Sequence, residues 1–138
     1  MKPDIWNLLH DGSIEGASGS VPGTVRLEID IQYLREKFSD DGRLIILTLH
    51  GCSKFEFSDN KDNLPRGINE IANFCPEILS ARDVGIYCEV TCFISNGHYG
   101  VIRVAADDFT LALDSGRIST LEELDSIAKA YWKDFGKR

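Results

Sequence analysis

Two short segments carry the residue types most suited to catalysis or metal binding, His10-Asp11 and His50-Gly51-Cys52. Side chains two positions apart on an extended chain point the same way, so His50 and Cys52 are expected on one side. If His10 and Asp11 lie near them, the four residues could bind zinc or form a Cys–His nucleophile. Short patterns of this kind also recur by chance. We therefore expect no enzymatic activity, no cofactor and no metal, and the alternative is a small metal-binding protein or Cys–His enzyme.

The three other cysteines favour packing over chemistry. Alternating apolar residues predict a strand over 84–94, with Cys88 and Cys92 on its apolar face. Four residues of strand separate these two thiols by about 13 Å, which is too far for a disulfide or a shared metal. We expect all the cysteines to be reduced, and Cys88 and Cys92 to lie in the core.

Trp6, Asp40 and Asp41 are the candidates for contact with a partner protein. Tryptophan is highly buried on average but is also enriched at binding hot spots. Trp6 is therefore expected either to pack against a C-terminal helix or to serve as an exposed anchor. Asp40-Asp41-Gly42 predicts a turn, where aspartate is favoured for its local hydrogen bonds. A local role and a partner-facing role for these two acids both stay open.

The overall charge limits the classes of partner. The chain has 15 Lys and Arg against 22 Asp and Glu, a formal net charge of -7. This balance argues against nucleic acid and anionic membranes, and it leaves a basic protein as a partner. A length of 138 residues predicts one domain over residues 1–138. No signal peptide is evident and no apolar run approaches the roughly 20 residues that cross a bilayer, so we expect a cytoplasmic protein.

The elements that position these residues are predicted to be mostly short strands. Alternating apolar and polar residues predict strands over 25–31, 84–94 and 99–105. A nearly continuous apolar run predicts a central strand over 44–49, which Gly51 interrupts before a hairpin or a bent continuation. The opening rich in Gly and Ser predicts turns with at most a short strand.

Two helical segments complete the pattern. Apolar spacing predicts the first over 68–75. The second closes the chain: it is predicted to begin with a capping box at Ser119 or Thr120, and its core-facing stripe reaches Phe135. Residues 95–98 predict a tight hairpin turn. Together these elements predict an α+β fold. We expect a curved, mainly antiparallel sheet (a partial barrel) of about six or seven strands with a packed C-terminal helix.

Several motifs together resemble a group of small uncharacterised bacterial single-domain proteins. They are Trp6-x-x-Leu-His10-Asp11-Gly12, Tyr33-Leu34-Arg35, Gly51-Cys52-x-x-Phe55-Glu56-Phe57 and a closing Tyr131-Trp132. A short acidic α+β domain that opens on a Leu-His-Asp element is also similar to immunity proteins of bacterial toxin systems. That similarity implies a role in binding and neutralising a toxin domain. Neither resemblance assigns a catalytic residue.

Three functions remain at this point. The first is a non-enzymatic protein-binding domain, with toxin neutralisation as one form of it. The second is the metal-binding or Cys–His enzyme already described. The third is a structural homo-oligomer, in which an exposed strand over 25–31 or 99–105 pairs across a two-fold axis of a homodimer. The negative charge and the lack of a catalytic signature favour the first.

Overall fold

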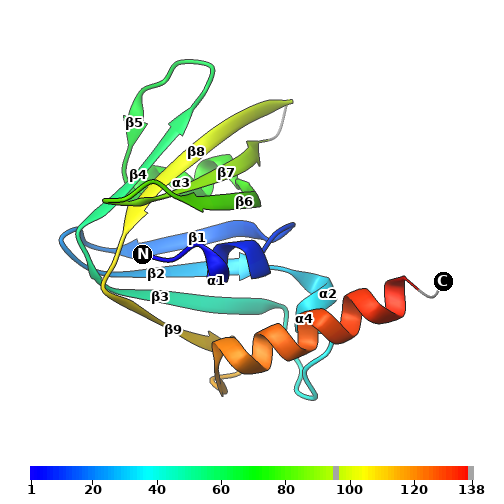
Figure 1. Cartoon of the computed structure of the whole chain (residues 1–138). Helices are drawn as coiled ribbons and strands as arrows, with labels where there is room; N and C mark the ends of the chain where they lie inside the picture. The colour runs from blue at the N-terminus through cyan, green and yellow to red at the C-terminus, as the bar shows by residue number, and fades with distance from the viewer. Residues whose placement is uncertain (95–96, 137–138) are drawn as a thin grey trace.

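Ten strands form one sheet in the computed structural model, which describes residues 1–94 and 97–136 (Figure 1). The strands are β1 (Ser13–Gly19), β2 (Gly23–Asp30), β3 (Leu44–Cys52), β4 (Lys54–Asp59), β5 (Pro65–Arg66), β6 (Glu77–Asp83), β7 (Cys88–Ile94), β8 (His98–Ala105), β9 (Asp108–Leu113) and β10 (Ile118–Ser119). The helices are α1 (Asp4–Leu8), α2 (Gln32–Arg35), α3 (Ile68–Phe74) and α4 (Leu121–Phe135). The strand order is β10-β9-β3-β2-β1-β6-β7-β8-β4-β5, and neighbouring strands run antiparallel.

The sheet folds back into two halves without closing into a barrel. The chain passes from one half to the other between β3 and β4 and again between β8 and β9, at the left of Figure 1. Across the middle of the sheet, β1 and β6 join through a single residue pair, Ser13 with Glu77. The α+β class, the antiparallel sheet and the C-terminal helix are confirmed. The strand count was wrong, because the described residues form ten strands rather than six or seven.

Gly51 allows the first of the two bends. Its φ is 59°, in the left-handed region, and a Cβ atom there would overlap the carboxylate of Asp107 at the second bend. The Asp107 N–H donates to the carbonyl of His50 at 3.0 Å, which ties the bends together. Beyond Gly51, β4 pairs with β8 and not with β3. The interruption is therefore a bent continuation, one of the two predicted forms.

Residues 84–94 do not form one strand, which corrects the prediction. Their first part is a turn between β6 and β7: the Val84 N–H donates to the Tyr87 carbonyl at 3.0 Å, and Gly85 has a φ of 104°. Ile86 lies on this turn with 86% of its surface exposed. The apolar alternation runs through the turn, so periodicity alone could not show where the strand begins.

The prediction for the segment rich in Gly and Ser was also wrong. Residues 13–19 form β1, which pairs with β2 over most of its length, and the turn is confined to the residues between them. Cross-strand pairing outweighed the weak strand preference of Gly and Ser here. The hairpin turn predicted over 95–98 includes residues 95 and 96, which lie outside the described residues.

The strands proposed for pairing in a homodimer are not at an edge. β2 lies between β1 and β3, and β8 lies between β7 and β4, so the hydrogen-bonding edges of both are occupied. The described sheet ends at β10 and β5, each only two residues long. Short edge strands offer little backbone for pairing between chains. That route to a dimer was wrong.

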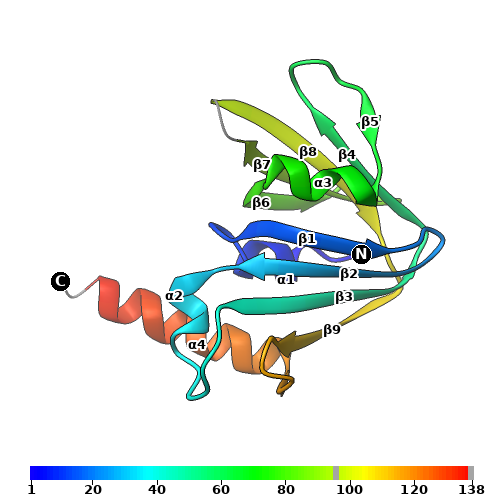
Figure 2. The ribbon, with the colours of Figure 1, turned by 180° about the vertical axis from the view of Figure 1, so that it is seen from behind.

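A single apolar core joins the sheet and the helices. Figures 1 and 2 show α1 and α4 on one side of the β1-β2-β3 half, and α3 on the other side. α1 contributes Ile5 and Trp6, and Leu9 follows directly after it; all three side chains are buried. Cys88 and Cys92 are buried in the same core, as predicted.

α4 starts at one of the two predicted caps. The Thr120 side chain accepts a hydrogen bond from the Glu123 N–H at 3.1 Å, and the Ser119 hydroxyl donates to the Glu123 carboxylate at 2.8 Å. Leu124 and Ala128 are buried, but Phe135 is 52% exposed, so the predicted core stripe ends before it. Among the described helices, α4 included, none is long and apolar enough to cross a membrane.

Candidate functional site

The four residues predicted for chemistry do not meet. His10 and Asp11 precede β1, whose first residue Ser13 pairs with Asp30 at the end of β2, and Asp30 pairs with Leu44 at the start of β3. The Tyr33 hydroxyl of α2 donates to the His10 carbonyl at 2.8 Å. His50 and Cys52 lie at the other end of β3, about 20 Å further along the strand. Within the described parts of the chain, no three His, Cys, Asp or Glu side chains are placed to hold a metal ion. These residues therefore do not make one catalytic or metal site.

His50 and Cys52 have local partners instead. The His50 ring bonds the Thr110 hydroxyl at 3.0 Å. The Cys52 thiol is fully buried and contacts the carbonyl of Lys54 at 3.3 Å. Burial raises the pKa of Cys52, and it raises that of Cys92 to about 12. Both thiols stay protonated near neutral pH, whereas a nucleophilic cysteine must be a thiolate.

Trp6 is fully buried, so its prediction as an exposed anchor was wrong. It belongs to the apolar core, the alternative expected for a large aromatic side chain. Its neighbours on α1 split by helical position: Ile5 is buried like Trp6, whereas Asp4 and Asn7 are exposed. The exposed side of α1 is therefore polar.

Asp40 is bound inside the protein by a buried arginine. Arg35, with a side chain 1% exposed, donates to the Asp40 carboxylate at 3.2 Å and to the Asp114 carboxylate at 2.9 Å. It also donates to the Asp41 carbonyl at 3.1 Å. The Ser115 hydroxyl donates to Asp40 as well, and this bond together with Arg35 lowers the pKa of Asp40. The Asp40 carboxylate therefore stabilises a loop and is not free for a partner. Of the two aspartates, only Asp41 is exposed.

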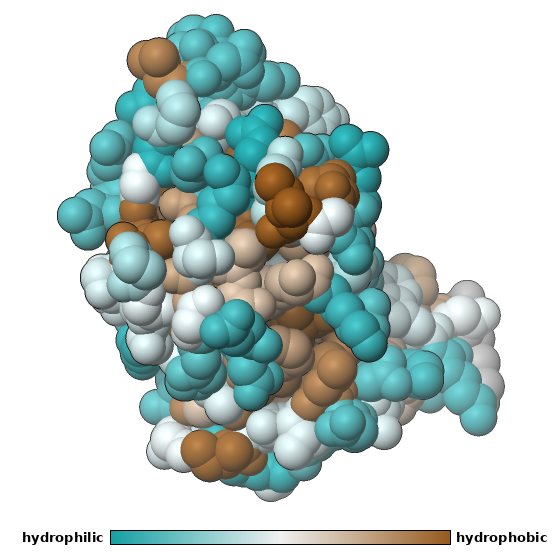
Figure 3. Space-filling view, turned by 60° about the vertical axis from the view of Figure 1, so that its left-hand side comes forward, coloured by the Kyte–Doolittle hydropathy of each residue, from teal (hydrophilic) through white to brown (hydrophobic). Residues whose placement is uncertain are grey.

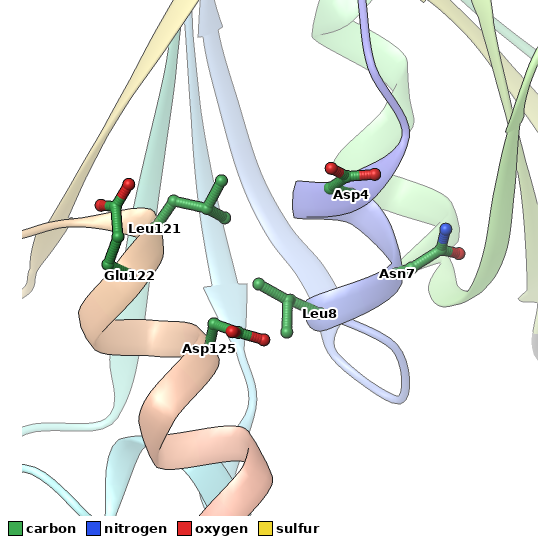
Figure 4. Close-up of a pocket in the computed structure, with 6 residues that line it drawn as sticks. All are labelled: Asp4, Asn7, Leu8, Leu121, Glu122 and Asp125. Carbon is green, nitrogen blue, oxygen red and sulfur yellow. The ribbon is translucent and has the colours of Figure 1, made fainter.

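A groove lies between α1 and α4, where Figure 4 shows its lining. It has a volume of about 430 Å³ and is lined by Asp4, Asn7, Leu8, Leu121, Glu122 and Asp125. We call it the α1/α4 groove. Leu8 and Asp125 extend toward each other from the two helices in Figure 4. Leu8 and Leu121 also pack against the core, so the floor is apolar and the margin carries three carboxylates.

The carboxylates of the α1/α4 groove are poorly neutralised. In the described structure, neither Asp4 nor Glu122 makes a side-chain hydrogen bond or ion pair, and Asp125 pairs only with the exposed Lys129 of the next turn at 2.8 Å. An exposed ion pair of this kind contributes little and exchanges readily. The groove therefore presents negative charge over an apolar floor, a combination suited to a cationic side chain with an aliphatic stem.

The Asn7 side chain is fixed, because its amide group is already hydrogen-bonded within the protein. Its side-chain oxygen accepts from the Ala81 N–H at 2.8 Å, and its side-chain nitrogen donates to the Ala81 carbonyl at 3.3 Å. This amide pairs with the backbone of β6 as another strand would, and so it holds α1 against the sheet. One wall of the groove is rigidly placed as a result.

An aromatic cluster lies at the C-terminal end of α4, the end away from the α1/α4 groove. It consists of His10, Tyr33, Tyr131, Trp132 and Phe135. The His10 ring stacks on Trp132 with centroids 5.4 Å apart, and the His10 Nδ1 donates to the Asn7 carbonyl at 2.8 Å. Trp132 is 40% exposed and Phe135 is 52% exposed. Exposed aromatics grouped in this way are typical of protein-binding surfaces.

The α1/α4 groove was not predicted, although part of the signal lies in the sequence. Glu122 and Asp125 stand out as acids in the first turns of a helix, where they also complement the helix dipole. Nothing in the sequence shows that Asp4 and Leu8, more than a hundred residues earlier, lie beside them. Only the packing of α1 on α4 makes the acids part of one groove.

Comparisons of the chain with protein-family models, curated proteins and solved structures found no match.

Proposed function

We propose that this chain is a non-enzymatic protein-binding domain of the cytoplasm that binds a basic protein through the α1/α4 groove and the neighbouring aromatic cluster. The observation that carries the proposal is the α1/α4 groove, where the carboxylates of Asp4, Glu122 and Asp125 lie around an apolar floor. Among the described residues, Asp125 alone of the three has an ion pair, with the exposed Lys129. The net charge of -7 adds to it, because an acidic protein attracts basic partners and accelerates their association. Nucleic acid is disfavoured for the same electrostatic reason.

Affinity capture with matched variants tests this proposal. The baits are the full chain, the double variant Asp4→Asn/Asp125→Asn in the groove, and the control Asp41→Asn/Glu56→Gln elsewhere. Both variants remove two negative charges, so a difference between them reports position and not net charge. The source is a lysate of the organism that encodes the chain.

The expected result is a protein rich in Lys and Arg that the full chain and the control capture and the groove variant loses. Its affinity for the full chain should fall as salt rises, because screening weakens attraction between exposed charges. If no protein shows this pattern, the proposal is wrong.

Toxin neutralisation is the most specific form of this proposal. It is supported by the similarity in style to immunity proteins and by the acidic groove, which suits a basic toxin domain. Co-expression of the chain with a toxin domain encoded beside its gene should restore growth of the host. The groove variant should restore it less than the control does, and equal rescue by both would count against the groove.

A further inference from the structure

We infer that the α1/α4 groove takes one arginine side chain from an α-helix of the partner, while an apolar residue two turns along that helix packs on Trp132 and Phe135. This inference rests on the proposed function and adds the chemistry of the contact. It draws on three features of the described residues: the make-up of the groove, the spacing along α4 and the exposure of the last turns of α4.

The make-up of the groove matches an arginine side chain. Leu8 and Leu121 provide an apolar floor for three methylene groups, and Asp4 and Asp125 provide carboxylates on opposite walls. A guanidinium group has five N–H donors in a planar fork, so it can bond to two separate carboxylates at once. A lysine ammonium is a compact, strongly hydrated charge without this planar fork, so it is less suited to bonding to both carboxylates at once.

The spacing along α4 sets the second contact. Asp125 and Trp132 are seven residues apart, which is two turns and about 10.5 Å of helix. At 100° per residue the two side chains lie within about 20° of each other around the axis, so they share one stripe of α4. A partner helix that lies along this stripe meets the acidic groove and the aromatic cluster with side chains at i and i+7.

The last turns of α4 leave room for such a helix. Figures 1 and 2 both show α4 extending past the end of the sheet, with α2 beside it. Trp132 is held by its stack on His10, so its exposed face is already placed and loses little freedom on binding. Figure 3 shows another side of the molecule, where apolar side chains gather in a band across the middle, bordered by polar ones, and α4 projects at the right.

Synthetic helical peptides test the inference directly. The reference peptide carries one Arg and, seven residues later, one Leu. A second peptide has citrulline in place of the Arg, a third has Lys, and a fourth has the Leu moved by two positions, which turns it by about 200°. Binding to the full chain is measured by calorimetry and by the fluorescence of Trp132, the exposed one of the two tryptophans.

We expect the citrulline and moved-Leu peptides to bind at least about tenfold more weakly than the reference, with the Lys peptide between them. On the protein side, Asp125→Asn and Trp132→Ala should each weaken the reference peptide by about tenfold, and Asp41→Asn by less than about twofold. Asp125→Asn is nearly isosteric and guards against loss of folding, which circular dichroism of each variant checks.

Equal binding of the citrulline or the moved-Leu peptide would overturn the inference, and so would the absence of binding at roughly 1 mM. The capture experiment separates this failure from failure of the proposed function. A partner that depends on the groove, together with peptides that do not bind, would leave the function standing and remove only the arginine helix.

Discussion

Replacing Arg35 with methionine should destabilise the fold more than replacing any exposed arginine. The Arg35 guanidinium donates to the carboxylates of Asp40 and Asp114 and to three backbone carbonyls, and its side chain is 1% exposed. Methionine fills much of the same volume but leaves those acceptors without a donor. Breaking a buried ion pair typically costs about 3–5 kcal/mol. The Asp40 and Asp114 side chains are 27% and 26% exposed and regain some water, so we expect the lower end, about 3 kcal/mol.

Urea unfolding of the full chain at pH 7 measures this effect. The matched control is Arg82→Met, because the Arg82 side chain is 73% exposed and pairs with Glu89 at the surface. Surface pairs contribute about 0–1 kcal/mol, so the control should stay within about 1 kcal/mol of the parent. Arg35→Lys keeps the charge but loses the planar fork, and it should lie between the two. A loss below about 1 kcal/mol for Arg35→Met, no larger than for the control, would refute the role given to this network.

Three further outcomes follow from the same structure. Burial opposes ionisation of Asp114, but hydrogen bonds from backbone N–H groups and from Arg35 lower its pKa from 3.8 to about 2. The ionised Asp114 therefore adds roughly 1–2 kcal/mol, after screening, to the free energy of unfolding above pH 4, and this stabilisation is lost as the pH falls through 2. In an acid titration of stability, Asp114→Asn should lose less of its free energy of unfolding between pH 4 and 2 than the parent does. Gly42→Ala should destabilise by about 2 kcal/mol or more in thermal unfolding, because its Cβ would overlap Arg35 and Asp114, whereas Gly67→Ala meets no atom within 4 Å and should be close to neutral. A thiol reagent at pH 8 should modify only Cys75 in the native protein, because Cys52, Cys88 and Cys92 are buried, and it should modify all four cysteines after unfolding. Modification of a second thiol in the native protein would contradict that burial.

Local patterns in the sequence predicted the elements whose own residues decide their structure. The strand β2 follows from strict alternation, with Val25 and Leu27 buried and Arg26 exposed. The start of α4 follows from Thr120 and Glu123, which cap it as the pattern indicates. In both cases the determining residues are within a few positions of each other.

The errors arose where distant contacts or backbone geometry decide the outcome. β1 is a strand despite its Gly and Ser content because β2 pairs with it, and the turn before β7 depends on the φ of Gly85. Arg35 looks like an ordinary helix-surface residue, and its burial depends on Asp114, 79 residues away. The α1/α4 groove likewise joins the two ends of the chain. Hydrophobic pattern and spacing carry no information about such pairings.

Hydrogen exchange of the full chain, with and without the basic partner that capture identifies, tests the central claim most directly. Binding through the α1/α4 groove should slow amide exchange in α1 and α4 and leave the strands β7 and β8, on the far half of the sheet, unchanged. The expected result is protection confined to α1, α4 and the neighbouring α2. Protection centred on β7 and β8, with α1 and α4 unaffected, would contradict the proposal that this groove binds the partner.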